Sequence, residues 1–332
     1  MTQSRYDVVA VGNAIIDILA AVPDAFLAEE GIAKGGMTLI DEDRADHLTA
    51  RMADAVVAAG GSAANTMTGV ASFGGTAAYI GKVADDALGA RFTQEFRASG
   101  VTFDTPPRPG QPGTARSLIA VTPDGQRSMN TYLGASTLLA ASDIDTALIQ
   151  SGATIFLEGY LFDRDEAKAA FVRAAELARA ASRKVALTLS DRFCVDRHRE
   201  SFRHLVKGHI DILFSNESEI TGLYENDDLN AALDSARNEC PLVIVTRGER
   251  GSLIAAGRET VEVATIPVAR VIDSTGAGDQ YAAGFLFGHA KGRSLAECGA
   301  LASLAAAEVI SHMGPRPEQN LRALALKSGF RT

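Results

Sequence analysis

The hydrophobic positions in the second half of the chain fall into short runs separated by longer helical stretches. Apolar runs of strand length lie at 153–157, 184–189, 210–214 and 242–245. The helical stretches lie at 165–181, 196–207 and 217–239. Regular alternation of this kind predicts an α/β fold whose mostly parallel sheet is covered by helices on both faces.

The remaining pattern is less regular but still predicts individual elements. The apolar run 6–12 ends in glycine and predicts a core strand, and 60–73 predicts a helix of small residues. The alternating run 114–122 and the turn residues 123–125 predict a hairpin. The β-branched run 268–272 predicts a strand, followed by a small-residue turn and a long helix.

Polar residues follow several of these strands. Ligands of a parallel sheet bind beyond the carboxyl ends of its strands. Ser190, Asn216, Arg247 and Asp273 are expected at those ends, and therefore near one another. The first strand is followed by Asn13 and not by GxGxxG, so the dinucleotide fingerprint is absent and a nicotinamide oxidoreductase is disfavoured.

The turn 273–279 has the composition of an anion-binding helix start. Thr275, Gly276, Ala277 and Gly278 are small enough for backbone amides to converge at a helix N-terminus, where the dipole favours an anion. Asp279 is then either an ordinary helix-dipole or capping residue, or a base beside the anion hole. A base next to an anion hole is the arrangement that a small-molecule kinase needs.

Composition narrows the partners. The chain has 332 residues, a hydrophobic content of 46% and a net charge of −9, so nucleic acid is an unfavourable partner. Its three cysteines are widely spaced, which argues against a disulfide framework or a zinc site. No signal peptide or membrane-spanning run is present in the sequence, and a cytoplasmic location without membrane contact is expected.

Two motifs resemble those of a known family. The segment DSTGAGDQYAAGFL (273–286) resembles the C-terminal signature of the ribokinase-like (PfkB) carbohydrate kinases, and GGSAANT (60–66) resembles their N-terminal signature. GNAIIDI (12–18) is similar to the opening of adenosine kinases within that family. The resemblance implies one domain over 1–332, a three-layer α/β/α fold with a mostly parallel sheet. It also implies a small β-lid from about 14–51 and 105–133.

The resemblance also implies the catalytic and acceptor residues. It makes Asp279 the general base, with Gly276, Ala277 and Gly278 forming the anion hole. The acceptor site would comprise Asn13, Asp17, Gly61, Ser62 and Asn65. Arg127 either approaches the substrate or phosphate when the lid closes, or is an exposed surface arginine. Phe193 either stacks on a purine or packs in the core.

Nucleotide and metal roles follow from the same resemblance. The residues implied near ATP are Ser190, Asn216, Thr246, Arg247, Gly248, Gly251, Thr275, Gly276 and Gly278. Those implied to organise cations are Asn216, Glu219 and Asp273, with Mg²⁺ held largely through water and a monovalent cation such as K⁺ near Asp273. Asn216 and Glu219 alternatively form a helix capping box, and 246–251 is alternatively a generic glycine-rich hairpin.

The phosphoryl acceptor is predicted less sharply than the reaction. GNAIIDI and Phe193 favour adenosine, the substrate of purine salvage. The charged pair Asp191-Arg192 stands where adenosine kinases often have Ala-Pro, which keeps ribose, fructose or 2-keto-3-deoxygluconate as alternatives. A non-catalytic nucleoside or sugar sensor is disfavoured because the motifs are intact. The sequence leaves open whether the protein is a monomer or a homodimer.

Overall fold

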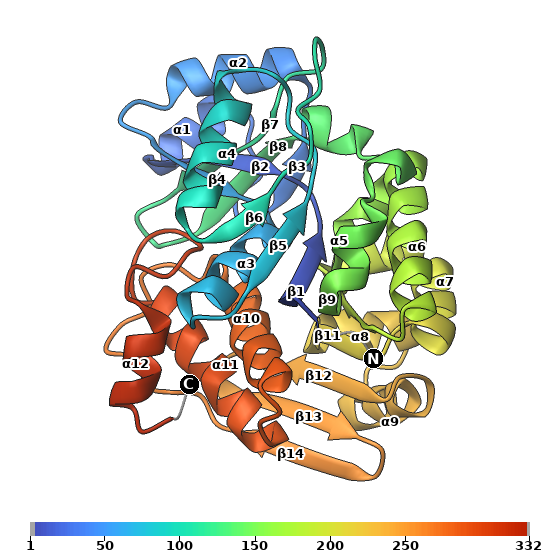
Figure 1. The fold of residues 1–332 in the computed structure, drawn as a ribbon. Helices are drawn as coiled ribbons and strands as arrows, with labels where there is room; N and C mark the ends of the chain where they lie inside the picture. Colours follow the sequence, from blue (N-terminus) through green and yellow to red (C-terminus); the bar gives the residue numbers. More distant parts are fainter. Residues whose placement is uncertain (1–3, 331–332) are drawn as a thin grey trace.

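A nine-stranded sheet forms the centre of the protein (Figure 1). The structure is a computed structural model and describes residues 4–330. The strands are ordered β14-β13-β12-β11-β10-β9-β1-β5-β6, parallel from β6 to β12 and antiparallel at β13 and β14. They are β1 (Tyr6–Val11), β5 (Ala77–Ile80), β6 (Val101–Phe103), β9 (Gly152–Glu158), β10 (Lys184–Thr188), β11 (Ile212–Asn216), β12 (Leu242–Thr246), β13 (Ser252–Ala256) and β14 (Glu259–Val263).

Helices cover both faces of this sheet and make the fold three-layered. One face carries α3 (Ser62–Ser72), α4 (Ala87–Ala98), α10 (Ala277–Ala290) and α11 (Leu295–Val309), with α12 (Leu321–Lys327) behind them. The other carries α5 (Thr146–Ser151), α6 (Asp165–Ala180), α7 (Arg192–His209), α8 (Glu217–Tyr224) and α9 (Leu229–Glu239). The predicted fold class is confirmed.

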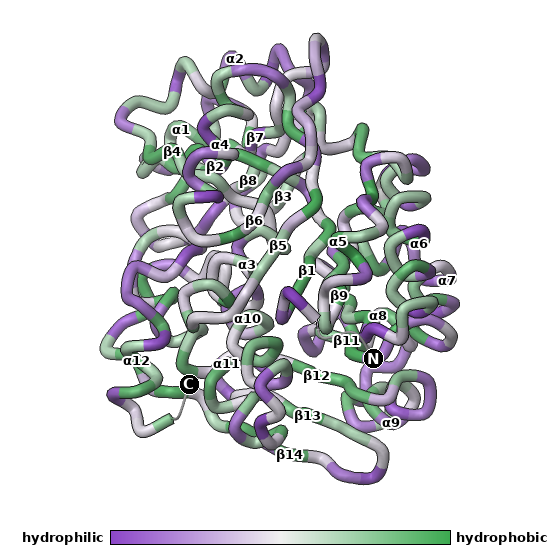
Figure 2. Tube along the Cα trace, viewed as in Figure 1, coloured by the Kyte–Doolittle hydropathy of each residue, from purple (hydrophilic) through white to green (hydrophobic). Residues whose placement is uncertain are grey.

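Strand residues alternate between two hydrophobic cores, as a sheet buried on both faces requires. In β1, Val8 and Ala10 belong to the core on the side of α3 and α10, whereas Val9 and Val11 belong to the core on the side of α5 and α6. Figure 2 accordingly shows hydrophobic colouring along β1, β9 and β12. Within residues 4–330, no helix is long and apolar enough to cross a bilayer.

Two predicted elements differ from the structure. The expected helix 217–239 is two helices, because Glu225 takes a left-handed conformation (φ 50°) and Asp228 caps the start of α9. The expected strand 268–272 is wrong. The sheet ends at β14, and this segment has no partner strand. The Ile272 N–H instead donates to Ile310 O at the end of α11.

A second sheet of five strands lies over one end of the first (Figure 1). Its order is β3-β8-β7-β2-β4, from β2 (Ile15–Ala21), β3 (Met37–Leu39), β4 (Val56–Gly60), β7 (Ala115–Val121) and β8 (Arg127–Tyr132). Helices α1 (Asp24–Glu29) and α2 (Glu42–Arg51) connect β2 to β3 and β3 to β4. The β7–β8 hairpin is confirmed, whereas β4 lies outside the segments expected to form a lid.

Strand β4 is an edge strand whose outward backbone groups are occupied by side chains from α4. The Ala59 N–H donates to Glu95 Oε2 over 2.8 Å, and Arg91 Nη2 donates to Val57 O. Arg91 and Glu95 also pair with each other over 2.7 Å. Two backbone groups of this edge, the Ala59 N–H and the Val57 C=O, are therefore covered within the chain.

Candidate active site

Asp279 connects the two signature motifs. It lies in the first turn of α10, partly buried, and accepts hydrogen bonds from Ser62 Oγ (2.7 Å) and Asn65 Nδ2 (3.1 Å) of α3. Burial raises the pKa of Asp279 to about 6, and the two hydrogen bonds oppose that rise. A carboxylate with a pKa near neutrality can accept a proton and release it again.

The turn before Asp279 is built for close approach to a ligand. Gly276 has a φ of 75°, and a Cβ there would lie 2.4 Å from Pro315 O, so glycine is required. A Cβ on Gly278 would meet nothing within 4 Å, because Gly278 borders an open cavity. The N-terminal amides of α10 thus face space in which an anion fits.

An acceptor cavity of about 220 Å³ lies on one side of Asp279. Its floor is polar and includes Asn13, Asp17, Asn65 and Glu158. The second sheet contributes Asp17, the hydroxyl side chains of Ser117 and Thr131, and an apolar wall formed by Ile15, Met37, Leu39, Ile119 and Met129. The alternate residues of these strands, Ile16 and Leu118 among them, pack into the core instead.

Asp17 is the carboxylate most available to a ligand in this cavity. Its side chain is buried, and among the described residues it has no hydrogen-bond partner. Burial raises the pKa of Asp17 to about 7, with Arg316 opposing the rise and Asp279 adding to it. A Cβ on Gly60 would lie 2.1 Å from Asp17 Oδ2, so the carboxylate packs directly against this glycine.

Asn13 is held in place by Glu158, a residue that the sequence analysis missed. Asn13 donates to Glu158 Oε1 through both its backbone N–H (3.3 Å) and its Nδ2 (2.8 Å), and Ala63 N–H donates to Oε2 (2.9 Å). Burial raises the pKa of Glu158 to about 7. Glu158 ends β9, so the same position rule that selected Ser190 and Asn216 could have found it.

A second, mostly polar cavity of about 250 Å³ lies on the other side of Asp279. Ser190, Asn216, Glu219 and Thr246 line it from the carboxyl ends of β10, β11 and β12, together with the Gly276–Gly278 turn. Ser190 borders both this cavity and the acceptor cavity, and its backbone is left-handed (φ 74°). A non-glycine residue in this conformation is uncommon and concentrates at functional sites.

Asn216 and Glu219 form the capping box that the sequence analysis gave as an alternative. Asn216 Oδ1 accepts from the Glu219 N–H, and the Glu219 carboxylate accepts from the N–H and Nδ2 of Asn216. Burial raises the pKa of Glu219 to about 7. Over residues 4–330, no cluster of three acidic, His or Cys side chains could hold a metal ion directly. The oxygen donors suit Mg²⁺ retained through water.

Arg127 and Asp273 join the second sheet to the Asp279 turn. Arg127 Nε lies 2.9 Å from Asp273 Oδ1, and its Nη2 donates to Ser274 Oγ over 2.8 Å. The side chain is 15% exposed, so the exposed-arginine alternative is wrong. Asp273 also accepts from Thr275 N–H, Thr275 Oγ1 and Gly314 N–H. Three of these contacts fall on Oδ1, including Arg127, and Oδ2 accepts only the Gly314 N–H among the described residues.

A third cavity, of about 460 Å³, continues from the polar one and is mostly apolar. Thr246, Gly248 and Gly251 border it as expected for a nucleotide site, and β12 and β13 form the hairpin of the alternative interpretation. Arg247 is not among its lining residues and pairs with Glu262 over 2.5 Å. The apolar wall was missed: it includes Ile266, Val268, Val271, Ala306, Ala307 and Ile310.

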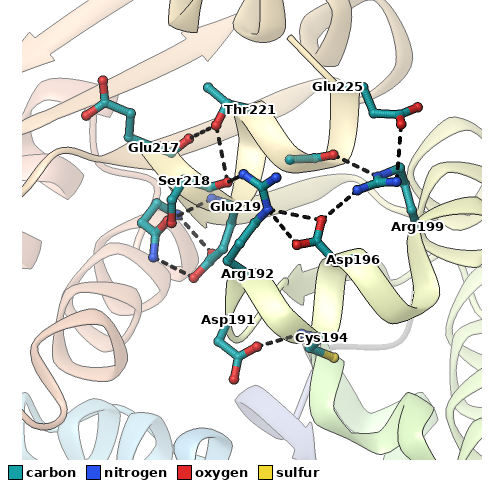
Figure 3. A network of polar contacts seen from close by, with 12 residues as sticks. Asp191, Arg192, Cys194, Asp196, Arg199, Glu217, Ser218, Glu219, Thr221 and Glu225 are labelled. Atoms are coloured by element: carbon teal, nitrogen blue, oxygen red, sulfur yellow. Dashed lines mark hydrogen bonds and ion pairs between the residues drawn. The ribbon is translucent and has the colours of Figure 1, made fainter. Parts of the chain in front are cut away.

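In the charged pair at 191–192, Asp191 contacts Cys194 in α7, and Arg192 contacts Asp196 in α7 and Ser218 in α8 (Figure 3). Asp191 caps α7 and accepts from the Tyr160 hydroxyl over 2.8 Å. Arg192 pairs with Asp196 and donates to Ser218 O at the start of α8. Neither residue of the pair lines the acceptor cavity, although Asp191 contacts Tyr160, which does.

Phe193 is not brought to the acceptor cavity. Its side chain is 68% exposed in the first turn of α7, and it is absent from the residues that line the cavity. The alternative of core packing is therefore wrong. The apolar contacts that the cavity does offer come from the second sheet.

Asp279 lies between the acceptor cavity and the N-terminus of α10, which faces the polar cavity. This is the geometry of a phosphotransferase. The chain matches the pfkB family carbohydrate kinases over residues 8–320. It therefore belongs to that family, whose kinases use ATP with Mg²⁺. It is a phosphotransferase with an alcohol acceptor, on a sugar or a nucleoside.

Relatives of both acceptor types are similar to this chain. The structure of adenosine kinase from Sinorhizobium meliloti is 50% identical, with a TM-score of 0.94, and the match covers 98% of this chain and 100% of that one. A probable sugar kinase from Rhizobium etli is 46% identical, with a TM-score of 0.95 over 98% and 99%. The adenosine kinase of Saccharomyces cerevisiae is 25% identical, over 92% and 95%.

Proposed function

We propose that the protein transfers the γ-phosphoryl group of ATP to the 5′-hydroxyl of adenosine or a related ribonucleoside. The observation that carries this proposal is that the acceptor cavity combines buried polar side chains with an apolar wall. A nucleoside has both a polyhydroxylated ribose and a flat, weakly polar base, and it matches both kinds of lining. Adenosine kinases from Sinorhizobium meliloti and Saccharomyces cerevisiae among the relatives support it.

In this proposal the floor orients the ribose. Asp17 accepts hydrogen bonds from vicinal hydroxyls, and Asn13, fixed by Glu158, contributes a further polar contact. The 5′-hydroxyl then points toward Asp279. Met37, Leu39 and the neighbouring apolar side chains contact the base.

The transfer step uses Asp279 and the turn before it. Asp279 takes the proton of the 5′-hydroxyl as its oxygen attacks the γ-phosphorus, and the β–γ bridging oxygen leaves with ADP. The amides of Gly276, Ala277 and Gly278 stabilise the negative charge on the phosphoryl group. When bound, Mg²⁺ supplies charge neutralisation of the phosphates, and Asn216 and Glu219 would hold it through water.

The second sheet acts in this proposal as a lid. Its inner face contacts the acceptor, and Arg127 contacts the Asp279 turn through Asp273 and Ser274. A closed sheet excludes water, which competes as a phosphoryl acceptor. The apolar third cavity would bind the adenine of ATP.

A free sugar is the second candidate, favoured by the similarity to the Rhizobium etli probable sugar kinase. A sugar would use the polar floor and leave the apolar wall without a partner. The deciding experiment measures ADP release with ATP and Mg²⁺ and, at about 1 mM each, adenosine, inosine, ribose, fructose or 2-keto-3-deoxygluconate. The proposal expects adenosine to be turned over best. If a free sugar is phosphorylated and neither adenosine nor inosine is, the nucleoside kinase proposal is replaced by the sugar kinase candidate.

A further inference from the structure

The loop between α11 and α12 reaches into the site at three consecutive residues. The Gly314 N–H donates to Asp273 Oδ2 over 2.9 Å. Pro315 O accepts from Gln280 Nε2 over 3.1 Å, next to Asp279. Arg316 Nε donates to Asn65 Oδ1 over 3.2 Å. The loop between α11 and α12 thus contacts both signature motifs.

The guanidinium of Arg316 is largely shielded from water, which makes its positive charge energetically unfavourable. Its Nη2 is shielded from solvent and has no hydrogen-bond partner among the described residues. Its guanidinium carbon lies 5.5 Å from the centre of the Phe96 ring. Burial lowers the pKa of Arg316 to about 10, so the side chain remains a cation at neutral pH. A buried and incompletely paired cation is destabilising unless nearby anions compensate it.

Arg316 determines which end of the Asn65 amide faces the base. Asn65 Oδ1 accepts from Arg316, which leaves Nδ2 to donate to Asp279 Oδ2. The two ends of an amide have nearly the same shape and opposite hydrogen-bonding character. In the reversed orientation, Oδ1 would face the Asp279 carboxylate and repel it.

The charge of Arg316 also acts on the acceptor carboxylate. The charged groups that face Asp17 are Arg316 and Arg127, which favour its ionised form, and Asp279 and Asp273, which oppose it. Arg316 is the larger of the two favourable influences. Arg316 does not line the acceptor cavity itself, so its action is exerted through Asn65 and Asp17.

We propose that Arg316 is a positioning residue for phosphoryl transfer, which orients the Asn65 amide toward Asp279 and supplies a positive charge on the acceptor side of the site. This inference rests on the proposed kinase function. It assigns to the C-terminal loop a part in the acceptor site that neither signature motif contains.

The kinetic test compares Arg316→Met and Arg316→Lys with the wild type, using adenosine as acceptor. Loss of a hydrogen bond to a charged donor predicts a fall in kcat/KM for adenosine of about 10- to 100-fold in Arg316→Met, with the Kd of ATP unchanged within about twofold. The deficit shrinks at pH 9, where Asp17 ionises without help. Arg316→Lys restores the pH profile, because it keeps the charge. Arg322→Met, an exposed arginine on α12, is the matched control.

A wild-type kcat/KM and pH profile in folded Arg316→Met would overturn the inference. So would an equal loss toward ATP and adenosine, because a general structural defect predicts that result. If no acceptor is phosphorylated by the wild type, the proposed function fails and a second measurement decides the inference. The inference then predicts that, at pH 8, Arg316→Met lowers the denaturant midpoint more in the wild type than in the Asp17→Asn background. Equal losses in the two backgrounds would contradict it.

Discussion

The acceptor cavity and the third cavity lie on opposite sides of the Asp279 turn and differ in chemistry. The acceptor cavity contains buried carboxylates whose pKa values are raised toward neutrality, among them Asp17 and Glu158. The third cavity has Val, Ile and Ala side chains in its wall, and within residues 4–330 Glu249 is the one acidic residue that lines it. Burying an ionisable group is costly, whereas burying an apolar one is favourable. The difference indicates that the acceptor cavity determines pH dependence and acceptor selection. The third cavity would bind its ligand mainly through apolar contacts.

Asp279→Asn is expected to have the largest effect on turnover, because Asp279 lines both the acceptor cavity and the polar cavity. An amide keeps the shape of the side chain but cannot accept the proton, so kcat should fall by on the order of 10²-fold or more. The Kd of ATP should stay nearly unchanged. The measurement is steady-state ADP release together with calorimetric ATP binding. Retained turnover would show that another group is the base.

Asp17→Asn should weaken use of the acceptor without affecting ATP. Loss of the charged acceptor of hydrogen bonds predicts a fall in kcat/KM for adenosine of about 10- to 100-fold, with the KM for ATP unchanged. Asp43→Asn, on exposed α2, is the matched control and should behave as the wild type. Equal effects on both substrates would mean that the two sides are not independent.

Gly278→Ala should affect the phosphate side without harming the fold. The added methyl meets no protein atom within 4 Å but enters the space beside the helix N-terminus. We expect the KM for ATP to rise by about 10-fold, equivalent to a loss of roughly 1.4 kcal/mol. Gly276→Ala is the contrasting variant, because its methyl would clash with Pro315 O and lower the thermal midpoint. An unchanged KM in Gly278→Ala would place the phosphates elsewhere.

The carboxyl groups with raised pKa values should also make the stability of the fold depend on pH. This is the smallest of the expected effects on turnover. Asp17, Glu158 and Glu219 have folded pKa values of about 7, above their unfolded values. The folded state therefore binds more protons between about pH 4 and 7, and the free energy of unfolding should fall as pH rises through that window. Asp17→Asn should flatten part of this fall, by roughly 1 kcal/mol or more. Urea unfolding from pH 5 to 8 measures it, and a rise in stability would contradict the assignment.

The sequence predicted the elements that carry the site better than the contacts between them. Ser190 and Asn216 were found because strand alternation places them at one edge of the sheet. Glu158 obeys the same rule, because it directly follows the apolar run 153–157, but the rule was not applied to it. The run 268–272 was expected to form a strand, since β-branched residues suit both a strand and a cavity wall. Arg316 was beyond reach, because its role depends on tertiary contacts with Asn65 and Phe96.

The covered edge of β4 has a consequence for self-association. Strand addition by a second copy needs free N–H and C=O groups along an edge. At β4 these groups at Ala59 and Val57 are already bonded to Glu95 and Arg91. To bond with the Ala59 N–H and the Val57 C=O, an incoming strand would have to displace Glu95 and Arg91 and separate their ion pair. These contacts therefore oppose strand addition at the β4 edge of the second sheet.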